Sequence, residues 1–298
     1  MRNEILRKEQ TIIDYYCFPT KTGDLSVFLD LEQYTDIREE GHYLRTQREV
    51  MKAKELGKLL LFDSQNKCFI NEFGERIDIE GKVIFPRSTI AESEKLMRYI
   101  EEAKGKSITS SSDYKKTELW FKKIKPKREY ELVTMMDLEK NLSKYEKKLG
   151  KFFFVKTVQK GFSGICMILE ISFENKNKYL MDSHFHSLNM TIRNPETKLL
   201  VSKKVDIISD EYGKREWRAF VVNNQLWSLS RCSDVSVEIE EYVHEEIESQ
   251  IKLFKGKVPA SYVVDFFEYK ENDKTVFDIV EFNPIIASGI FADNQIVF

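Results

Sequence analysis

Two acidic residues and an asparagine near the end of the chain have the chemistry of a magnesium site. Asp265 lies in one apolar segment, Glu281 and Asn283 close the next, and the polar stretch 270–274 predicts a hairpin turn between them. Side chains alternate along a strand, so we expect all three on one face of the hairpin. Hard oxygen ligands of this kind suit magnesium bridging the phosphates of a nucleotide. The alternative is an exposed hairpin with incidental acids, but charges in apolar strands are costly unless paired or metal-bound.

A lysine within a second apolar segment has the chemistry of a phosphate contact. Lys156 lies in the run Phe152–Val158, and Gly161-Phe162-Ser163-Gly164 follows it. A cation in an apolar strand needs an anionic partner, which a phosphate provides. The glycine turn can close over phosphates through its backbone amides. A glycine hairpin without a ligand is an equally open alternative for this segment taken alone.

The order of these features resembles the ATP-grasp superfamily. A lysine strand with a glycine loop comes first, a basic strand with Arg218 follows, and an Asp…Glu-x-Asn hairpin leads to Ser288-Gly289. The chain most resembles a divergent clade of small bacterial and phage proteins of this superfamily, over roughly residues 107–298. The resemblance implies an α+β fold of two lobes gripping ATP, preceded by an N-terminal α/β lobe. We place the lobes at residues 1–112, 113–204 and 205–298.

The resemblance also implies a role for each matching residue. The magnesium ligands would be Asp265, Glu281 and Asn283. The nucleotide contacts would come from the helix lysine Lys115 or Lys116, from Lys156, Lys160, Gly161, Ser163 and Gly164 in the strand and glycine loop, and from Ser202, Lys203, Lys204 and Val205 in the adenine hinge. Arg218, with Arg231, would stabilise the phosphate in transfer. From its place beside Pro86 at a strand end, we infer that Arg87 grips an acidic substrate.

The chain departs from the superfamily's pattern in two places. Its glycine loop is shorter and poorer in glycine than is usual, so closure over the phosphates differs. The adenine hinge usually carries a glutamate, whereas Lys203 and Lys204 stand in the corresponding stretch. Adenine contacts at such a hinge are largely made by the backbone, so we expect nucleotide binding to survive this change.

The function implied by the resemblance is ATP- and magnesium-dependent ligation. The γ-phosphoryl group passes to a substrate carboxylate, and an amine then attacks the acyl phosphate; this is chemistry of positioning and charge neutralisation. The carboxylate and amine substrates are unknown, a peptide or protein being one class. A phosphotransferase on the same fold and a non-catalytic nucleotide-binding accessory protein remain open. Retention of both acids, Asn283 and Lys156 favours the catalytic alternatives.

Helices and strands must position these residues. Leu59–Phe62 and Val83–Phe85 predict buried strands, and a helix from Ser88 or Thr89 to Gly105 completes one α/β unit. Further strands are predicted near residues 130–134, 152–158, 167–173, 179–190, 199–208, 218–222, 226–230, 262–269 and 276–283. Further helices are predicted near 113–122, 138–149 and 237–254.

Composition limits the class of protein. The 298 residues are 42% hydrophobic and 32% charged with a net charge of −2, which gives no general argument for nucleic-acid binding. The four cysteines lie far apart and read as reduced thiols. Met1–Gln10 lacks the apolar core of a signal peptide, and no apolar run approaches the roughly 20 residues that span a bilayer. We expect a soluble cytoplasmic protein that does not bind membranes.

Three other motifs give weaker hypotheses. Gly105-Lys106-Ser107 imitates the end of a P-loop, but Ile100 stands where that motif needs glycine. His184 and His186 alternate on a predicted strand without a third ligand at a recognisable spacing, which favours a structural role over a metal site. The basic run Lys122–Arg128 is better explained as a solvated loop than as a nucleic-acid contact.

Overall fold

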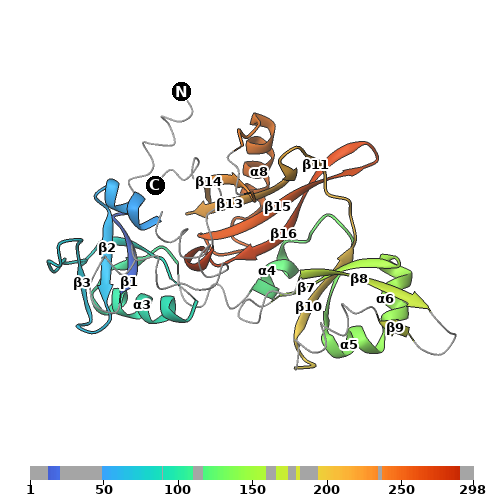
Figure 1. Ribbon diagram of the computed structural model, residues 1–298, viewed down its shortest axis with the longest axis horizontal. Coiled ribbons are helices and arrows are strands. Elements are labelled where there is room, and N and C mark those ends of the chain that lie inside the picture. Colours follow the sequence, from blue (N-terminus) through green and yellow to red (C-terminus); the bar gives the residue numbers. More distant parts are fainter. Residues whose placement is uncertain are drawn as a thin grey trace. The chain divides into compact units, whose positions relative to one another are not determined.

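The computed structural model describes residues 13–20, 49–88, 90–109, 117–158, 166–173, 179–181, 194–233 and 237–288 (Figure 1). The chain divides into two compact units. The first unit comprises residues 1–114, 217–264 and 283–298, and the second comprises residues 115–216 and 265–282. The three lobes placed from the sequence stay a prediction. Among the described residues, no helix combines the length and the apolar character needed to cross a membrane.

The first unit begins with a five-stranded sheet. Its strands are β1 (Tyr15–Thr20), β2 (Leu59–Asp63), β3 (Cys68–Ile70), β4 (Val83–Pro86) and β5 (Lys106–Ser107), in the order β3-β2-β1-β4-β5. Only β3 runs antiparallel to its neighbour; the other pairings are parallel. Helix α3 (Ile90–Glu102) follows β4, so the α/β unit predicted from the sequence is confirmed.

Both faces of this sheet are buried, as expected for parallel strands. Tyr16 and Phe18 lie in one apolar cluster, whereas Cys17 between them lies in another. Leu96 and Ile100 of α3 join the Cys17 cluster. Apolar residues on successive positions therefore serve two cores, which explains the unbroken apolar runs of the sequence.

The described part of the first unit also contains whole elements and parts of others from later in the chain. These are β14 (Gln225–Arg231), α8 (Glu241–Phe254), η5 (Ile285–Ala287), most of β13 (Glu216–Val222) and the start of β15 (Tyr262–Glu271). Phe220, Val263 and Ile285 share the core cluster of Tyr16. Helix α8 packs against β14. It starts four residues later than predicted, and residues 237–240 are not helical.

The second unit contains an antiparallel sheet in the order β6-β10-β7-β8-β9. Its strands are β6 (Tyr130–Thr134), β7 (Phe152–Thr157), β8 (Cys166–Phe173), β9 (Tyr179–Met181) and β10 (Lys198–Lys203). The same unit holds α4 (Thr117–Lys123), α5 (Met135–Lys140), α6 (Leu142–Leu149) and the small ribbon β11 (Ser209–Asp210) with β12 (Gly213–Lys214). In Figure 1, α5 and α6 lie side by side against the sheet, and their apolar residues share one cluster with β7 and β10.

The single helix predicted near 138–149 is wrong, because Asn141 interrupts it. The backbone of Asn141 leaves the helical region with φ −123° and ψ 30°. Its side-chain amide donates to the Asp137 carboxylate over 2.8 Å, and the Tyr145 hydroxyl donates to the same carboxylate. Thr134 caps the first of the two helices, since its hydroxyl accepts the Asp137 N–H over 3.0 Å. Asp137 therefore joins the two short helices.

The predicted terminal hairpin is confirmed, with a tighter turn than expected, whereas the placing of Asp265, Glu281 and Asn283 on one face stays a prediction. Strand β15 runs to Glu271 and β16 (Lys274–Asn283) starts three residues later, so only Asn272 and Asp273 form the turn. Both have positive φ, 49° and 61°, as in the two-residue turns that fit the twist of a hairpin. These strands complete a sheet of order β14-β13-β15-β16.

We expect Asp137→Ala to destabilise the second unit by about 1–3 kcal/mol, because it leaves the buried Tyr145 hydroxyl without its acceptor. Urea unfolding followed by far-ultraviolet circular dichroism measures the change. Glu139→Ala, at an exposed position on the same helix, is the control and should change stability by less than about 0.5 kcal/mol. Equal unfolding midpoints for the two variants would contradict the role given to Asp137.

Candidate functional site

An ion pair between Lys156 and Glu281 joins the central sheet of the second unit to the hairpin strand β16. Phe153 and Val155 face the helices α5 and α6 through their shared core, so alternation turns Lys156 to the opposite face. The side chains of Lys156 and Glu281 are only 11% and 14% exposed. The structure thus brings the predicted phosphate ligand and a predicted metal ligand into contact.

Two further carboxylates belong to this neighbourhood. Asp265 is buried on β15, and Glu216 is half-buried at the start of β13. Burial raises the pKa of the Glu216 carboxyl above its usual range; the charge on Lys214 lowers it, the charge on Asp265 raises it and the charge on Lys156 lowers it. Glu216 therefore feels the charges of both Lys156 and Asp265. Glu216 was not predicted from the sequence, although it stands only two residues before Arg218.

The chemistry of the predicted ligands suits magnesium, and their joint role as metal ligands stays a prediction. Asp265 and Glu281 supply carboxylate oxygens, the ligands that this hard cation prefers. Among the described residues, no three Cys, His, Asp or Glu side chains gather closely enough to form a metal cluster by themselves.

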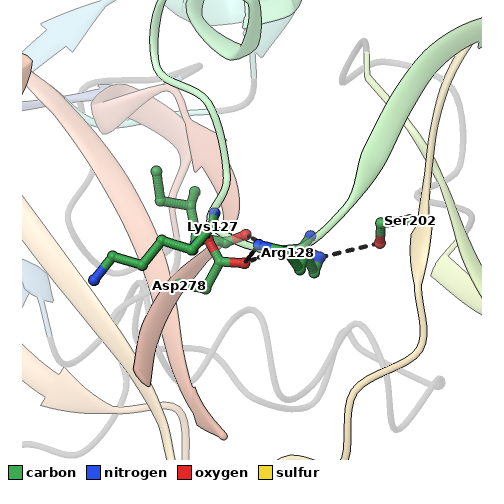
Figure 2. Close-up of polar contacts among 5 residues, drawn as sticks. Lys127, Arg128, Ser202 and Asp278 are labelled. Carbon is green, nitrogen blue, oxygen red and sulfur yellow. Dashed lines mark hydrogen bonds and ion pairs between the residues drawn. The ribbon is translucent and has the colours of Figure 1, made fainter. Parts of the chain in front are cut away.

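A second buried ion pair lies between Arg128 and Asp278 in the same unit (Figure 2). Arg128 Nη1 donates to Asp278 Oδ2 over 2.8 Å, and Arg128 Nε donates to the Ser202 hydroxyl over 3.0 Å. The prediction of a solvated basic loop at Lys122–Arg128 is wrong for Arg128, whose side chain is 3% exposed. The intervening lysines are exposed as predicted.

The predicted adenine hinge connects β10 to the hairpin. Strand β10 ends at Lys203, and Ile207 then bridges to Tyr269 of β15. Lys204 Nζ lies 3.5 Å from the Asp206 carboxylate and 5.9 Å from the centre of the Phe152 ring. Val205 is half-buried between them. The stretch 204–206 is therefore a short connection outside both sheets, as a hinge that offers its backbone to a base requires.

Comparisons with known proteins find similarity in structure. No protein-family model and no curated protein match the chain. The D-alanine-D-alanine ligase from Coxiella burnetii is similar with a TM-score of 0.52 at 14% identity, over 94% of this chain and 87% of that chain. The ATP-grasp ligase PsnB, solved with a phosphomimetic variant of its minimal precursor, Mg and ADP, is similar with a TM-score of 0.50 at 13% identity, over 93% and 89%. The chain has the ATP-grasp fold.

A third solved structure agrees with this assignment. D-alanyl-alanine synthetase A from Vibrio cholerae is similar with a TM-score of 0.50 at 14% identity, over 92% of this chain and 90% of that chain. The ATP-grasp fold predicted from the sequence is thereby confirmed. Membership in a small bacterial and phage clade stays a prediction.

The two arginines predicted to act together on the phosphate belong to the first unit and lie on opposite faces of a strand pair. Arg231 is paired with Trp217 across β13 and β14, so it shares a face with Trp217. Its guanidinium lies 5.7 Å from the centre of the Trp217 ring, and the residue is 1% exposed. Arg218, the next residue along, must face the other way. The roles predicted for Arg218 and Arg231 toward the transferred phosphate stay predictions.

Arg87 is held by a set of contacts within the first unit. Nε and Nη2 donate to the two oxygens of Glu49 over 2.7 and 2.8 Å. Nη1 donates to the Ile285 carbonyl over 2.6 Å, and Nη2 also donates to the Ser288 carbonyl over 2.8 Å. These contacts give Arg87 the role of fixing the segment that follows Asn283. Gripping a substrate stays a prediction, and it would require the guanidinium to exchange these partners.

Other predicted residues fall elsewhere. Outside the described residues lie Lys115, Lys116, Lys160, Gly161, Ser163, Gly164, His184 and His186. Asn283 ends β16 and belongs to the first unit, as does Arg218, so their roles toward metal and phosphate stay predictions. The Ser202 hydroxyl accepts from Arg128, and Lys203 is exposed while its N–H donates to the Glu129 carbonyl over 2.9 Å.

We expect Glu216→Gln to raise the melting temperature at pH 8 in the presence of EDTA, with the gain disappearing toward pH 4. A carboxyl whose pKa is raised by folding contributes its full stability below the unfolded value of about 4.3 and loses it as pH rises through the folded pKa. The glutamine side chain of Glu216→Gln does not titrate, so the variant does not lose this stability as pH rises. Glu211→Gln, at an exposed position, is the control. A gain independent of pH would contradict the burial of a charge at Glu216.

Proposed function

We propose that this protein binds magnesium-ATP in its second unit and uses it to join a carboxylate to an amine. The observation that carries the proposal is the Lys156–Glu281 ion pair on an ATP-grasp fold, with Glu216 close enough to feel the charges of both Lys156 and Asp265. A cation and carboxylates gathered on buried strands match the opposite charges of a nucleotide phosphate and a divalent metal. PsnB, a ligase of the same fold, was solved with Mg and ADP, which agrees with this assignment.

Each residue of the cluster has a distinct role in the proposal. Lys156 donates to a phosphate oxygen and balances its charge. Asp265 and Glu281 hold magnesium, with Asn283 as a further ligand from the resemblance. When bound, magnesium neutralises charge on the phosphates and orients them for transfer. Backbone groups of residues 203–206 receive the adenine.

The ion pair explains how these charges are kept without a ligand. Lys156 and Glu281 neutralise one another on nearly buried strands, where an isolated charge would be costly. On binding, Lys156 moves to a phosphate and Glu281 to the metal, so each charge exchanges one opposite charge for another. Metal and nucleotide thus assist one another, because each releases the residue that the other needs.

The reaction follows from a fixed γ-phosphate beside a substrate carboxylate. The bond between the γ-phosphorus and its bridging oxygen breaks and releases ADP, while a carboxylate oxygen forms the new bond to phosphorus. The amine nitrogen then attacks the acyl carbon, the carbon–oxygen bond to phosphate breaks, and inorganic phosphate leaves with a proton lost from nitrogen. Lys156, and Arg218 by resemblance, offset the negative charge during transfer.

Release of ADP in the presence of candidate carboxylates and amines tests the function, with product mass spectrometry to identify the bond formed. A condensed product, formed with ADP and phosphate, is the expected result. A phosphorylated product that no amine displaces would favour a phosphotransferase. Tight nucleotide binding with no turnover against peptide, amino-acid and protein substrates would favour a non-catalytic binder.

We expect Glu281→Gln to change nucleotide affinity in opposite directions with and without magnesium. In EDTA, ADP should bind more tightly than to wild type, because Lys156 is released from its carboxylate partner. In magnesium, ADP should bind more weakly by about tenfold or more, corresponding to a lost metal ligand of at least 1.4 kcal/mol. Isothermal titration calorimetry measures both.

Two further variants complete this test. Lys156→Met should weaken ADP binding in both conditions, by roughly 10- to 100-fold for a lost charge-assisted hydrogen bond. Lys148→Met, which removes a partly exposed ion pair of the same unit with Glu131, is the control and should leave affinity unchanged. If Glu281→Gln changed the affinity for ADP in the same direction in EDTA and in magnesium, the proposed exchange of partners by Lys156 and Glu281 would be excluded.

A further inference from the structure

Asp278 accepts four hydrogen bonds in the interior of the second unit. Oδ1 accepts the backbone N–H groups of Lys127 and Ile279, both over 2.8 Å. Oδ2 accepts the backbone N–H of Arg128 over 3.1 Å and its Nη1 over 2.8 Å. The side chain is 1% exposed, and these donors supply the hydrogen bonds that a carboxyl group buried in this way requires. Asp278 thereby fixes the chain at Lys127–Arg128 against β16.

The guanidinium of Arg128 extends this attachment to two strands. Nη1 also donates to the Ile279 carbonyl over 2.7 Å, and Nε donates to the Ser202 hydroxyl on β10 over 3.0 Å. The guanidinium carbon lies 5.1 Å from the centre of the Phe267 ring. Figure 2 shows Arg128 lying between Asp278 on one side and Ser202 on the other. One side chain therefore holds β10 and β16 at a set separation.

The two attachment points lie next to the two ends of the proposed nucleotide site. Ser202 is followed at once by residues 203–206, the hinge for adenine. Ile279 stands two residues before Glu281, a separation of about 7 Å along a strand. A nucleotide reaching from the hinge to the metal ligands must match the spacing that Arg128 fixes.

We infer that Arg128 is a positioning residue for nucleotide binding, which sets the distance between the adenine hinge and the metal-binding strand. This inference rests on the proposed function. A ligand that engages both ends gains from a fixed spacing, because engaging the first end places the second at high effective concentration. A ligand that engages only one end gains nothing from the spacing. Lysine cannot replace arginine here, because a single ammonium lacks the planar fork that reaches Asp278, Ile279 and Ser202 together.

The test compares one intact ligand with two fragments of it. Mg-ADP engages both ends, adenosine engages the hinge alone, and magnesium tripolyphosphate engages the metal end alone. Their affinities are measured by calorimetry and by displacement of a fluorescent nucleotide from wild type, Arg128→Lys and Arg128→Met/Asp278→Asn. The double variant removes both charges, so it leaves no buried carboxylate without its cation.

Leu138→Ala provides the matched control. Leu138 is fully buried in the core between α5, α6 and their sheet, so its truncation destabilises the unit without touching the Arg128 contacts. All variants are compared at a temperature where circular dichroism shows them folded. This separates loss of positioning from loss of stability.

We expect both Arg128 variants to bind Mg-ADP about tenfold more weakly, a change of 1.4 kcal/mol, and to bind each fragment within about twofold of wild type. Leu138→Ala should match wild type for all three ligands. Equal weakening of the intact ligand and the fragments, or no weakening of Mg-ADP, would overturn the inference while the proposed function stands. Failure of wild type to bind Mg-ADP or either fragment would overturn the proposed function and the inference with it.

Discussion

Charges placed on buried strands must find opposite charges, and this constraint organises the protein around Lys156. Its ion pair with Glu281 satisfies both side chains where either alone would destabilise the fold. The pair also joins the central sheet of the second unit to the terminal hairpin. Because Lys156 is paired with a carboxylate, it can pair with a phosphate instead when a metal ion binds that carboxylate. The same electrostatic requirement therefore stabilises the protein without ligand and prepares it for one.

Two other buried ion pairs meet the same requirement with a different result. Arg128 is joined to Asp278 and to two neighbouring strands, and Arg87 is joined to Glu49 and to two carbonyls of residues 285–288. In both, the planar fork of arginine serves several acceptors at once, which an ammonium cannot do. Removal of one partner from such a pair typically costs about 3–5 kcal/mol. These arginines therefore fix segments, whereas the single ammonium of Lys156 is suited to changing partners.

Local sequence patterns were sufficient to predict the elements that carry the site. Alternating and apolar runs located β7, β15 and β16, and the lysine and carboxylates within those runs marked the positions of interest.

Contacts between distant segments could not be predicted from such patterns. Nothing local to Arg128 indicates that Asp278 lies beside it, 150 positions away along the chain, and the basic run around it suggested a solvated loop. The face on which Arg231 lies was beyond local patterns for the same reason, because it depends on pairing with Trp217 across two strands. Glu216 was missed because its environment comes from charges on other strands.

A crystal structure of the protein with magnesium and ADP would show whether Lys156 and Glu281 exchange partners when the nucleotide binds. We expect Lys156 Nζ to leave Glu281 and lie within hydrogen-bonding distance of a phosphate oxygen, while the Glu281 and Asp265 carboxylates coordinate magnesium at about 2.0–2.1 Å. The adenine should contact backbone groups of residues 203–206. An intact Lys156–Glu281 ion pair beside bound nucleotide, or a nucleotide bound away from β7 and β16, would contradict it.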